Sequence, residues 1–476
     1  MSAMIKNPGE HPPVQFDANL IRKLSQQGPR YTSYPTADRF TDGFRSGDYL
    51  QAVSDLRHAG ARKPISLYLH IPFCESLCYY CACNKIITRN HAKAEVYLTY
   101  LKREIDMQAA LFSGMNQVEQ LHFGGGTPTF LSDAQMGALM AHLRRAFHFA
   151  ADIDGEYSIE IDPRTVDADR IRSLRNQGFN RLSLGVQDFD EEVQKAVNRI
   201  QPEALTLDAI VAAREAGFRS ISVDLIYGLP RQNVMSMART LTRLIAADPD
   251  RISVYNYAHM PQMFKSQRLI ADDELPTPEA KLDMLSLCIQ RLTQAGYVYI
   301  GMDHFAKPDD ELAVAQRLGT LQRNFQGYST HAEAEMVSCG VSAISSVGGT
   351  YSQNAKSLDQ YYEPIERGHL PIVRGFKLTM DDMLRRAIIQ RLMCAFEVSV
   401  KAIETDYPVT FASYFATELG KLRELEDDGL VSLSDDWITV TARGRLLVRN
   451  ICMAFDKYLG IGQAVKLERL RYSRTI

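Results

Sequence analysis

The sequence predicts an α/β fold, with a partial barrel of six βα units followed by a mainly helical, winged-helix-like C-terminal domain. The middle of the chain alternates short β-branched runs with amphipathic segments, the pattern of parallel strands joined by helices. From about Phe376 the pattern changes to helices and a short hairpin. We therefore expect three parts along the chain: an N-terminal arm (1–60), a barrel domain with extensions (61–375) and a C-terminal helical domain (376–476).

Six runs are expected to form the strands of the barrel: Ile65–His70, Gln120–Phe123, Ser158–Asp162, Arg181–Val186, Ser220–Leu225 and Arg251–Tyr257. The helices expected between them are Ala94–Leu111, Asp133–Phe147, Ala168–Gln177, Pro202–Glu215 and Met235–Ala246. Successive units with right-handed crossovers favour a barrel or partial barrel, although a flat doubly wound sheet would use the same units. In both arrangements the ligand binds at the carboxyl ends of the strands.

Four cysteines, Cys74, Cys78, Cys81 and Cys83, lie in one short stretch directly after the first expected strand. The first three have the CxxxCxxC spacing, which leaves a 4Fe-4S cluster one ligand short and its fourth iron open to a small molecule. A zinc site would pair CxxC with a second pair downstream, and a disulfide framework is typical of short secreted chains. The remaining cysteines stand alone in the sequence, so the spacing favours the cluster over zinc and over inert thiols.

Polar residues or glycines follow each later strand of the predicted barrel. They are Gly124-Gly125-Gly126-Thr127-Pro128, Glu160 and Asp162, Gln187 and Asp188, Asp224, and Asn256 with Ala258. A single polar residue at a strand end is usually a loop cap, and a lone glycine run is usually a plain turn. Because several occur in succession at the face where barrel enzymes place their sites, they favour a polar ligand cavity.

Composition excludes several classes of protein. The formal net charge of -3, with both signs interspersed, gives no electrostatic footprint for nucleic acid or an anionic membrane. No apolar run approaches the ~20 residues that span a bilayer, and the start of the chain is polar. We expect a cytoplasmic protein that binds neither nucleic acid nor membrane. Any anionic partner then has to be met by a local basic pocket.

The C-terminal part is expected to contain helices at Met380–Cys394 and Tyr414–Glu426, a hairpin at Val431–Val440 and a long last helix from about Ala442. Helices followed by a hairpin wing raise a second kind of function, an iron-sulfur sensor that binds DNA. The acidic stretches Glu424–Asp428 and Asp435-Asp436 argue against it, because phosphate contacts need clustered Lys and Arg. Salt-dependent DNA binding would support the sensor.

Several motifs carry a family resemblance. The CxxxCxxC loop after the first strand, Tyr80 before the third cysteine and the GGGTP turn resemble the radical S-adenosylmethionine (AdoMet) superfamily. Further segments resemble the oxygen-independent coproporphyrinogen III oxidase family: Gly28–Thr36, Cys83-Asn84-Lys85, Asp224–Pro230, Gly301–Phe305, Asn324–Tyr328 and Arg449–Cys452. The related heme chaperones lack the fourth cysteine and the N-terminal arm, both of which this chain has. Tyr80 and Ala82 stand where the family commonly has Phe and Gly, and neither is a cluster ligand.

The resemblance implies one 4Fe-4S cluster, held by Cys74, Cys78 and Cys81, and two AdoMet molecules. Carried over by motif, the contacts of the cluster-bound AdoMet are Tyr68, Gly125, Glu160 and Ile344. Those of the second AdoMet are Tyr80, Gly126, Thr127, Gln187, Arg199, Asp224 and Ala258. The resemblance also implies a catalytic role for Cys83, which the spacing alone does not explain.

The resemblance further implies an oxidoreductase of porphyrin and heme biosynthesis. A 5'-deoxyadenosyl radical would take hydrogen from the β-carbon of two propionates of coproporphyrinogen III, and loss of carbon dioxide and one electron from each would give the vinyl groups of protoporphyrinogen IX. We expect a monomer that receives electrons from a donor such as flavodoxin or ferredoxin. The substrate's carboxylates need cations, for which Arg30, Arg385, Arg386 and Arg449 are candidates.

Overall fold

A computed structural model describes residues 13–60, 63–114 and 117–459 of the chain. The chain forms two compact units, each discontinuous in sequence. The larger unit contains residues 40–284 and 333–377, and the smaller contains 285–332 together with the two ends of the chain, up to residue 39 and from residue 378. The three-part division along the chain stays a prediction.

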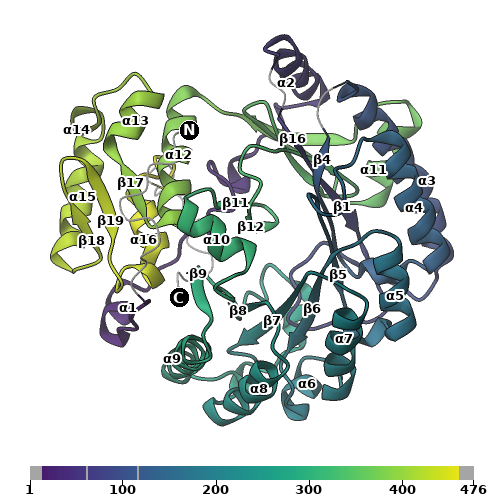
Figure 1. Cartoon of the computed structure of the whole chain (residues 1–476), viewed down its shortest axis with the longest axis horizontal. Coiled ribbons are helices and arrows are strands. Elements are labelled where there is room, and N and C mark those ends of the chain that lie inside the picture. Colours follow the sequence, from purple (N-terminus) through teal and green to yellow (C-terminus); the bar gives the residue numbers. More distant parts are fainter. Residues whose placement is uncertain (1–12, 61–62, 115–116, 460–476) are drawn as a thin grey trace. The chain divides into compact units, whose positions relative to one another are not determined.

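The larger unit is built on a parallel sheet whose strands follow one another in chain order (Figure 1). These strands are β1 (Ile65–Ile71), β4 (Val118–Gly125), β5 (Glu156–Ile161), β6 (Arg181–Gln187), β7 (Ser220–Tyr227) and β8 (Arg251–Asn256). A doubly wound sheet would reverse its strand order at a switch point. Since these strands do not reverse, the predicted partial barrel of βα units is confirmed, with each strand within about two residues of its expected bounds.

Helices follow the strands and lie along one side of this sheet (Figure 1). They are α3 (Ala92–Leu111), α4 (Asp133–Ala146), α5 (Ala168–Asn176), α6 (Glu191–Ala196), α7 (Glu203–Glu215) and α8 (Val234–Ala246). Local sequence fixes where several of them start. Ser132 forms a capping box with Gln135 at α4, and Asn233 accepts from the backbone of Ser236 at α8. Their buried apolar residues cover the outer side of the strands, which leaves the inner side for other residues.

Four further strands extend the sheet beyond β1, and the sequence did not predict them. β13 (Glu335–Cys339) runs parallel to β1, and β14 (Ile344–Val347), β15 (Thr350–Asn354) and β16 (Ile372–Lys377) continue the sheet in antiparallel order. In the same unit are α2 (Ser46–His58), α11 (Leu358–Glu366) and the short parallel pair β2 (Phe73–Cys74) and β3 (Ile86–Ile87). Helix α9 (Pro278–Gln294) carries the chain from the larger unit to the smaller.

The smaller unit contains the winged-helix-like arrangement that the sequence predicts. Its first part has α1 (Ala18–Leu24), the hairpins β9 (Val298–Gly301) with β10 (His304–Ala306) and β11 (Gln322–Asn324) with β12 (Gly327–Ser329), and α10 (Glu311–Leu318). Its last part has α12 (Met380–Ala395), β17 (Glu397–Ser399), α13 (Val400–Asp406), α14 (Phe411–Tyr414), α15 (Ala416–Asp427), β18 (Val431–Leu433) and β19 (Trp437–Val440). Strands β17, β19 and β18 pair as one antiparallel sheet after the helices.

The long last helix expected from Ala442 is wrong for the described residues. A 3-10 turn at Arg445–Leu447 precedes α16 (Val448–Met453), which has six residues. Gly444 lies so close to the sheet that a Cβ there would be 2.0 Å from the carbonyl oxygen of Leu430. This close approach, with the turn in which the Gly444 amide bonds to Thr441, delays the helix.

Residues 13–39 of the predicted N-terminal arm lie in the smaller unit and are joined to its C-terminal part by specific bonds, whereas residues 40–60 lie in the larger unit. The Tyr31 hydroxyl donates to Asp456 at 3.0 Å, and the Arg449 guanidinium donates to the carbonyl oxygens of Pro29, at 2.9 Å, and Gly28.

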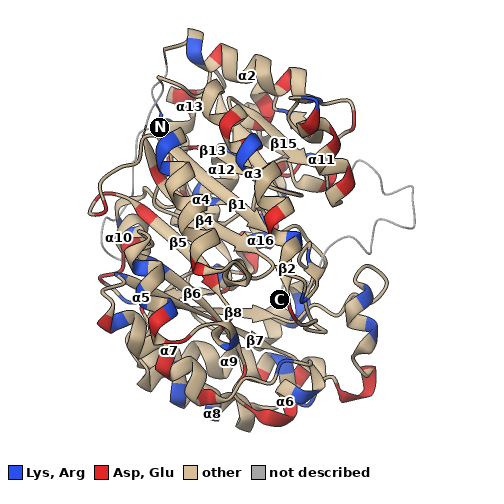
Figure 2. Ribbon diagram, turned by 90° about the vertical axis from the view of Figure 1, so that its right-hand side faces the viewer, with Lys and Arg blue, Asp and Glu red and all other residues tan. Residues whose placement is uncertain are grey.

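Basic and acidic residues are interspersed over the ribbons of the molecule (Figure 2). Among the helices in the described ranges, none has the length and apolar character needed to cross a membrane.

Candidate active site

The inner face of the parallel sheet is polar, because every second residue of its strands is polar. Adjacent strands pair Tyr68 with His122 and His122 with Ser158, and one layer further along they pair Glu160 with Ser183. Ser183 is paired in turn with Ser222, and Asp224 with Ser253. Residues directly opposite one another on neighbouring strands point to the same face. The strands therefore present a continuous set of hydroxyl, imidazole and carboxyl groups toward their carboxyl ends.

The cysteine loop follows β1 and β2 at this edge and is fastened from several sides. The Tyr79 amide donates to the Val197 carbonyl at 3.0 Å, and the Asn198 side chain donates to the Leu77 carbonyl at 2.8 Å. On another side the Ser266 hydroxyl donates to the Cys81 carbonyl at 3.0 Å. These bonds hold the loop in place through the protein's own contacts.

The glycine turn after β4 fits against this loop. The Gly126 amide donates to the Ile71 carbonyl at 2.8 Å and the Thr127 amide to the Phe73 carbonyl at 2.8 Å. A Cβ at Gly126 would lie 2.7 Å from the backbone of Phe73, so the approach requires glycine. At Gly125, with φ +113°, a Cβ would meet the His70 ring at 2.6 Å. The glycines thus let the strand-end turn and the cysteine loop pack in direct contact.

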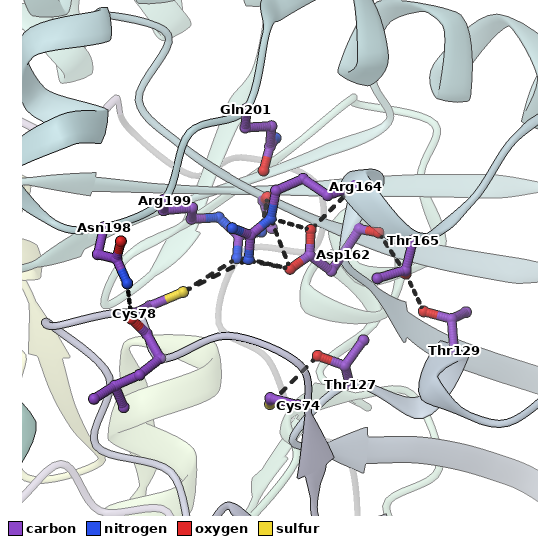
Figure 3. Close-up of polar contacts among 12 residues, drawn as sticks. Cys74, Cys78, Thr127, Thr129, Asp162, Arg164, Thr165, Asn198, Arg199 and Gln201 are labelled. Atoms are coloured by element: carbon purple, nitrogen blue, oxygen red, sulfur yellow. Dashed lines mark hydrogen bonds and ion pairs between the residues drawn. The ribbon is translucent and has the colours of Figure 1, made fainter. Parts of the chain in front are cut away.

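A buried charge cluster lies beside Cys78 (Figure 3). Arg199 donates to the Asp162 carboxylate at 3.0 Å, to the Gly185 carbonyl at 2.7 Å and to the Cys78 sulfur at 3.5 Å. Arg164 also binds Asp162, at 2.7 Å, and reaches the Cys78 sulfur at 3.8 Å. Burial alone would raise the pKa of Asp162, but the two guanidinium groups hold it below its usual value. The sulfur of Cys78, one of the predicted cluster ligands, therefore lies in contact with two guanidinium groups.

The other cysteines of the loop differ in their surroundings. Cys74 accepts from the Thr127 hydroxyl at 3.4 Å, and burial raises its pKa to about 11. Cys81 and Cys83 share a hydrogen bond, which together with the Lys85 ammonium lowers the pKa of Cys81 to about 6. The same hydrogen bond and burial raise the pKa of Cys83. Of this group Cys83 is the exposed member.

The donor set of the loop fits a cluster. Across the described ranges, no three Cys, His, Asp or Glu side chains gather closely enough to hold a single metal ion. A 4Fe-4S cube takes one thiolate per iron, so its ligands surround it from separate corners and do not converge on one point. Three thiols on one fastened loop, with cations nearby, match that need.

The pKa values of the two predicted carboxylates, Glu160 and Asp224, are shifted in opposite directions. Burial would raise the pKa of Glu160, but hydrogen bonds from His122, at 3.1 Å, and from the Gly125 amide, at 3.2 Å, lower it. Burial and the charge of Glu160 together raise the pKa of Asp224 to about 7, although hydrogen bonds from Ser253 and Ser183 act to lower it. Glu160 is therefore a fixed anion, whereas Asp224 changes its charge near neutral pH.

The remaining predicted residues lie near the same sheet edge. Gln267 donates to the carbonyls of both Tyr80, at 3.0 Å, and Ala258, at 3.2 Å, and so joins the cysteine loop to the end of β8. Gln187 ends β6 with a φ of +69°, an unusual backbone for a residue other than glycine. Ile344 begins β14, and its carbonyl accepts from Ser338 on β13. The structure thus brings together residues from widely separated segments.

The arginines considered for the substrate already have partners in the smaller unit. Arg385 is ion-paired with Asp381, at 2.9 Å, and Glu418, at 2.7 Å. Arg30 is ion-paired with Asp303, and Arg449 binds carbonyls of the arm. Arg386 is half-buried in α12. Their role in binding substrate stays a prediction.

Several residues of this edge were missed from the sequence, above all His70, His122 and Arg164. His70 is buried and bonds to Tyr68 at 3.1 Å and to the Asn84 carbonyl at 3.0 Å, which connects β1 to the end of the cysteine loop. Burial lowers its pKa, so it is held neutral. The signal that could have found His122 is the alternation of polar and apolar residues along β4. Arg164 lies in a short 3-10 helix, Pro163–Thr165, and has no such signal.

Comparison with known proteins identifies the family. Residues 68–244 match the radical SAM superfamily, and residues 378–447 match the HemN C-terminal domain. The chain is 52% identical to oxygen-independent coproporphyrinogen III oxidase of Pseudomonas aeruginosa, over 97% of this chain and 99% of that protein. It is also 52% identical to the Escherichia coli enzyme of that name, over 94% and 96% of the two chains. The solved structure of E. coli HemN, described as a radical SAM enzyme, superposes with a TM-score of 0.89 at 50% identity, covering 94% of this chain and all of that one. The chain therefore belongs to the oxygen-independent coproporphyrinogen III oxidase family of the radical SAM superfamily.

Proposed function

We propose that this chain converts coproporphyrinogen III to protoporphyrinogen IX without oxygen, by oxidative decarboxylation of two propionate side chains to vinyl groups. One observation carries the proposal: the fastened cysteine loop stands at the polar carboxyl edge of the sheet in a chain 52% identical over 97% of its length to an enzyme of that name. Each propionate would give up one hydrogen atom, one electron and carbon dioxide. The reaction belongs to porphyrin and heme biosynthesis.

Membership of the superfamily implies a 4Fe-4S cluster and AdoMet. Bound together, they supply one-electron cleavage of a sulfonium and a strong acceptor for a hydrogen atom. Cys74, Cys78 and Cys81 would hold the cluster. Arg164 and Arg199 would help to position the Cys78 sulfur, since both reach it. The protein's own part is to bind, orient and keep water from the reacting groups.

Two AdoMet molecules are part of the proposal. Tyr68, Gly125, Glu160 and Ile344 would contact the one at the cluster, and Tyr80, Gly126, Thr127, Gln187, Arg199, Asp224 and Ala258 the second. The opposite pKa shifts of Glu160 and Asp224 support two separate AdoMet sites. Glu160 is a fixed anion that can accept from an ammonium or ribose hydroxyls, whereas Asp224 can bind with or without charge.

The electron source and the assembly complete the proposal. A small electron carrier such as flavodoxin or ferredoxin would reduce the cluster, and the chain would act as a monomer. A cytoplasmic setting suits this chemistry, because thiolate ligands need reduced cysteines.

An anaerobic assay tests the proposal. Protein with a reconstituted cluster is mixed with dithionite, AdoMet and coproporphyrinogen III, and porphyrin products are measured together with 5'-deoxyadenosine. Protoporphyrinogen IX with two equivalents of 5'-deoxyadenosine supports it. Cleavage of AdoMet without any change in the porphyrin would contradict it.

Cys83→Ser is expected to keep the iron-sulfur absorption and lose turnover. AdoMet would take the position at the fourth iron, so Cys83 would not be needed to hold the cluster. The Cys83 thiol is hydrogen-bonded to Cys81, and Cys83 is the exposed cysteine of the loop. Iron content, absorption and product are measured on one preparation. Iron loss as severe as in Cys74→Ala would make Cys83 a ligand.

Glu160→Gln and Asp224→Asn are expected to affect different AdoMet molecules. Glu160→Gln should weaken binding at the cluster and reduce AdoMet cleavage with or without substrate. Asp224→Asn should spare that cleavage but weaken the second AdoMet by about 10- to 100-fold, the cost of one charge-assisted hydrogen bond. Anaerobic equilibrium dialysis gives the affinity and stoichiometry of AdoMet for each variant.

The pH dependence supplies the control for this pair. Because the pKa of Asp224 is raised to about 7, its carboxylate forms as the pH rises through neutrality. Binding of the second AdoMet should therefore tighten from pH 6 to 8 in the wild type, and this trend should vanish in Asp224→Asn. A variant that binds two AdoMet molecules as tightly as wild type would refute the role of Asp224.

A further inference from the structure

Two side-chain nitrogens of a buried arginine in the smaller unit lack hydrogen-bond acceptors. Arg323 lies in β11 and is 3% exposed, and its Nε and Nη1 atoms are both buried without a partner. A guanidinium stays charged under all ordinary conditions. Burying that charge without an acceptor is unfavourable in free energy, so a position of this kind favours the binding of an anion.

The surrounding residues hold Arg323 in place. The Gln390 side chain on α12 accepts from the Arg323 amide at 3.1 Å and donates to its carbonyl at 2.6 Å. Across the hairpin, the guanidinium lies 4.9 Å from the centre of the Tyr328 ring, and the Tyr328 hydroxyl donates to the Met393 carbonyl at 3.0 Å. The ring offers a weak attraction through its face but no acceptor in the plane of the guanidinium. The backbone of Arg323 and the ring beside its guanidinium are thus held in place by the protein.

Other charges near Arg323 add to its positive field. The charges of Arg30 and Arg323 both act on Arg449, and with its burial they lower the pKa of Arg449 to about 9. Asp303 acts in the opposite direction and is ion-paired with Arg30. We call these three guanidinium groups and one carboxylate the arginine cluster: Arg30, Asp303, Arg323 and Arg449.

We propose that Arg323 of the arginine cluster binds a carboxylate of the tetrapyrrole, one of the two propionates that survive the reaction. The inference rests on the proposed function. Guanidinium groups bind carboxylates through charge-assisted hydrogen bonds, which would satisfy the orphaned donors. A propionate that must leave as carbon dioxide would be stabilised against decarboxylation by such a pair. A surviving propionate stays anionic in substrate and product, so it suits a permanent anchor.

The test compares Arg323→Met with a matched control, Arg445→Met. Arg445 is also 3% exposed and lies over an aromatic ring, 4.6 Å from the centre of Phe396, in the same unit. Binding of coproporphyrinogen III and of protoporphyrinogen IX to the cluster-loaded protein is measured by anaerobic equilibrium dialysis. The porphyrinogens are quantified by fluorescence after oxidation. AdoMet affinity and substrate-free AdoMet cleavage are measured in parallel, with thermal unfolding as the check on folding.

We expect Arg323→Met to weaken both porphyrinogens by about 10- to 100-fold, with AdoMet binding and cleavage unchanged, and Arg445→Met to leave both affinities near those of wild type. Arg323→Lys keeps the charge but loses the planar donor geometry, so it should lose affinity by a smaller factor; if Arg323→Met does not fold, this variant decides. Unchanged porphyrinogen affinity overturns the inference, as does a loss confined to coproporphyrinogen. If Arg323→Met weakened AdoMet binding, the carboxylate bound by Arg323 would be that of AdoMet, and this result would also overturn the inference. Wild-type protein that fails to bind or convert coproporphyrinogen III would instead refute the proposed function itself.

Discussion

Replacement of Cys74, Cys78 or Cys81 by alanine is expected to abolish AdoMet cleavage and remove most of the visible iron-sulfur absorption. With Cys74, Cys78 and Cys81 as its proposed ligands, the cluster would already be one protein ligand short, so a second open iron would leave it held at two corners. The loop itself should stay in place, because its fastening bonds involve the backbone near Tyr79 and Cys81 and not the thiols. Iron and sulfide content, absorption and 5'-deoxyadenosine are the measurements.

Cys288→Ala is the matched control. Cys288 is buried in α9 and lies far along the chain from the cysteine loop, so its loss should leave iron content and AdoMet cleavage intact. A triple alanine variant of the loop that retained full iron and activity would show that the cluster is held elsewhere.

Asp162→Ala is expected to destabilise the iron-free protein by about 3–5 kcal/mol, the usual cost of leaving a buried charge without its partner. Arg199 is ion-paired with Asp162 at 3.0 Å and only 8% of its side chain is exposed. Arg164, also paired with Asp162, would lose its carboxylate as well. Urea unfolding followed by circular dichroism measures the difference. Because both guanidinium groups also contact Cys78, the variant should load iron poorly.

Asp169→Ala provides the comparison, since Asp169 is 88% exposed in its pair with Arg172 and should cost at most about 1 kcal/mol. The pH dependence gives a second check. The folded pKa of Asp162 is depressed, so its stabilisation is present above the unfolded value of about 3.9 and is lost as the pH falls through the folded pKa. Equal losses for the two variants would contradict the buried pair.

The barrel was predictable because its strands and helices each satisfy a local rule. Runs such as Ser220–Tyr227 combine β-branched residues with flanking turns, and helices such as α4 begin at a capping box. Strands β13 to β16 were not predicted, because their pairing with β1 joins segments far apart in sequence. The length of the last helix was overestimated, because the close contact of Gly444 with Leu430 forms only when the chain has folded.

The site was predictable to the extent that topology alone gathers strand ends. The positions of Glu160 and Asp224 followed from that rule, but their opposite pKa shifts depend on His122 and on burial, which no local pattern shows. The cluster of Asp162, Arg164 and Arg199 brings a strand end together with loops about forty residues apart, so sequence spacing could not reveal it. The polar alternation along the strands was the one available signal that was left unused.

The chain order of the parallel strands has a consequence for synthesis on the ribosome. Strands β4 to β8 each pair with the preceding strand of the large sheet, so this side of the sheet can grow as the chain emerges. The other edge of β1 waits for β13, which begins at Glu335. At ~5–20 residues per second, the interval after β4 is complete lasts roughly 10–40 s, during which an apolar edge strand has unpaired backbone groups. Nascent chains stalled before residue 335 should therefore be especially prone to aggregate or to bind chaperones.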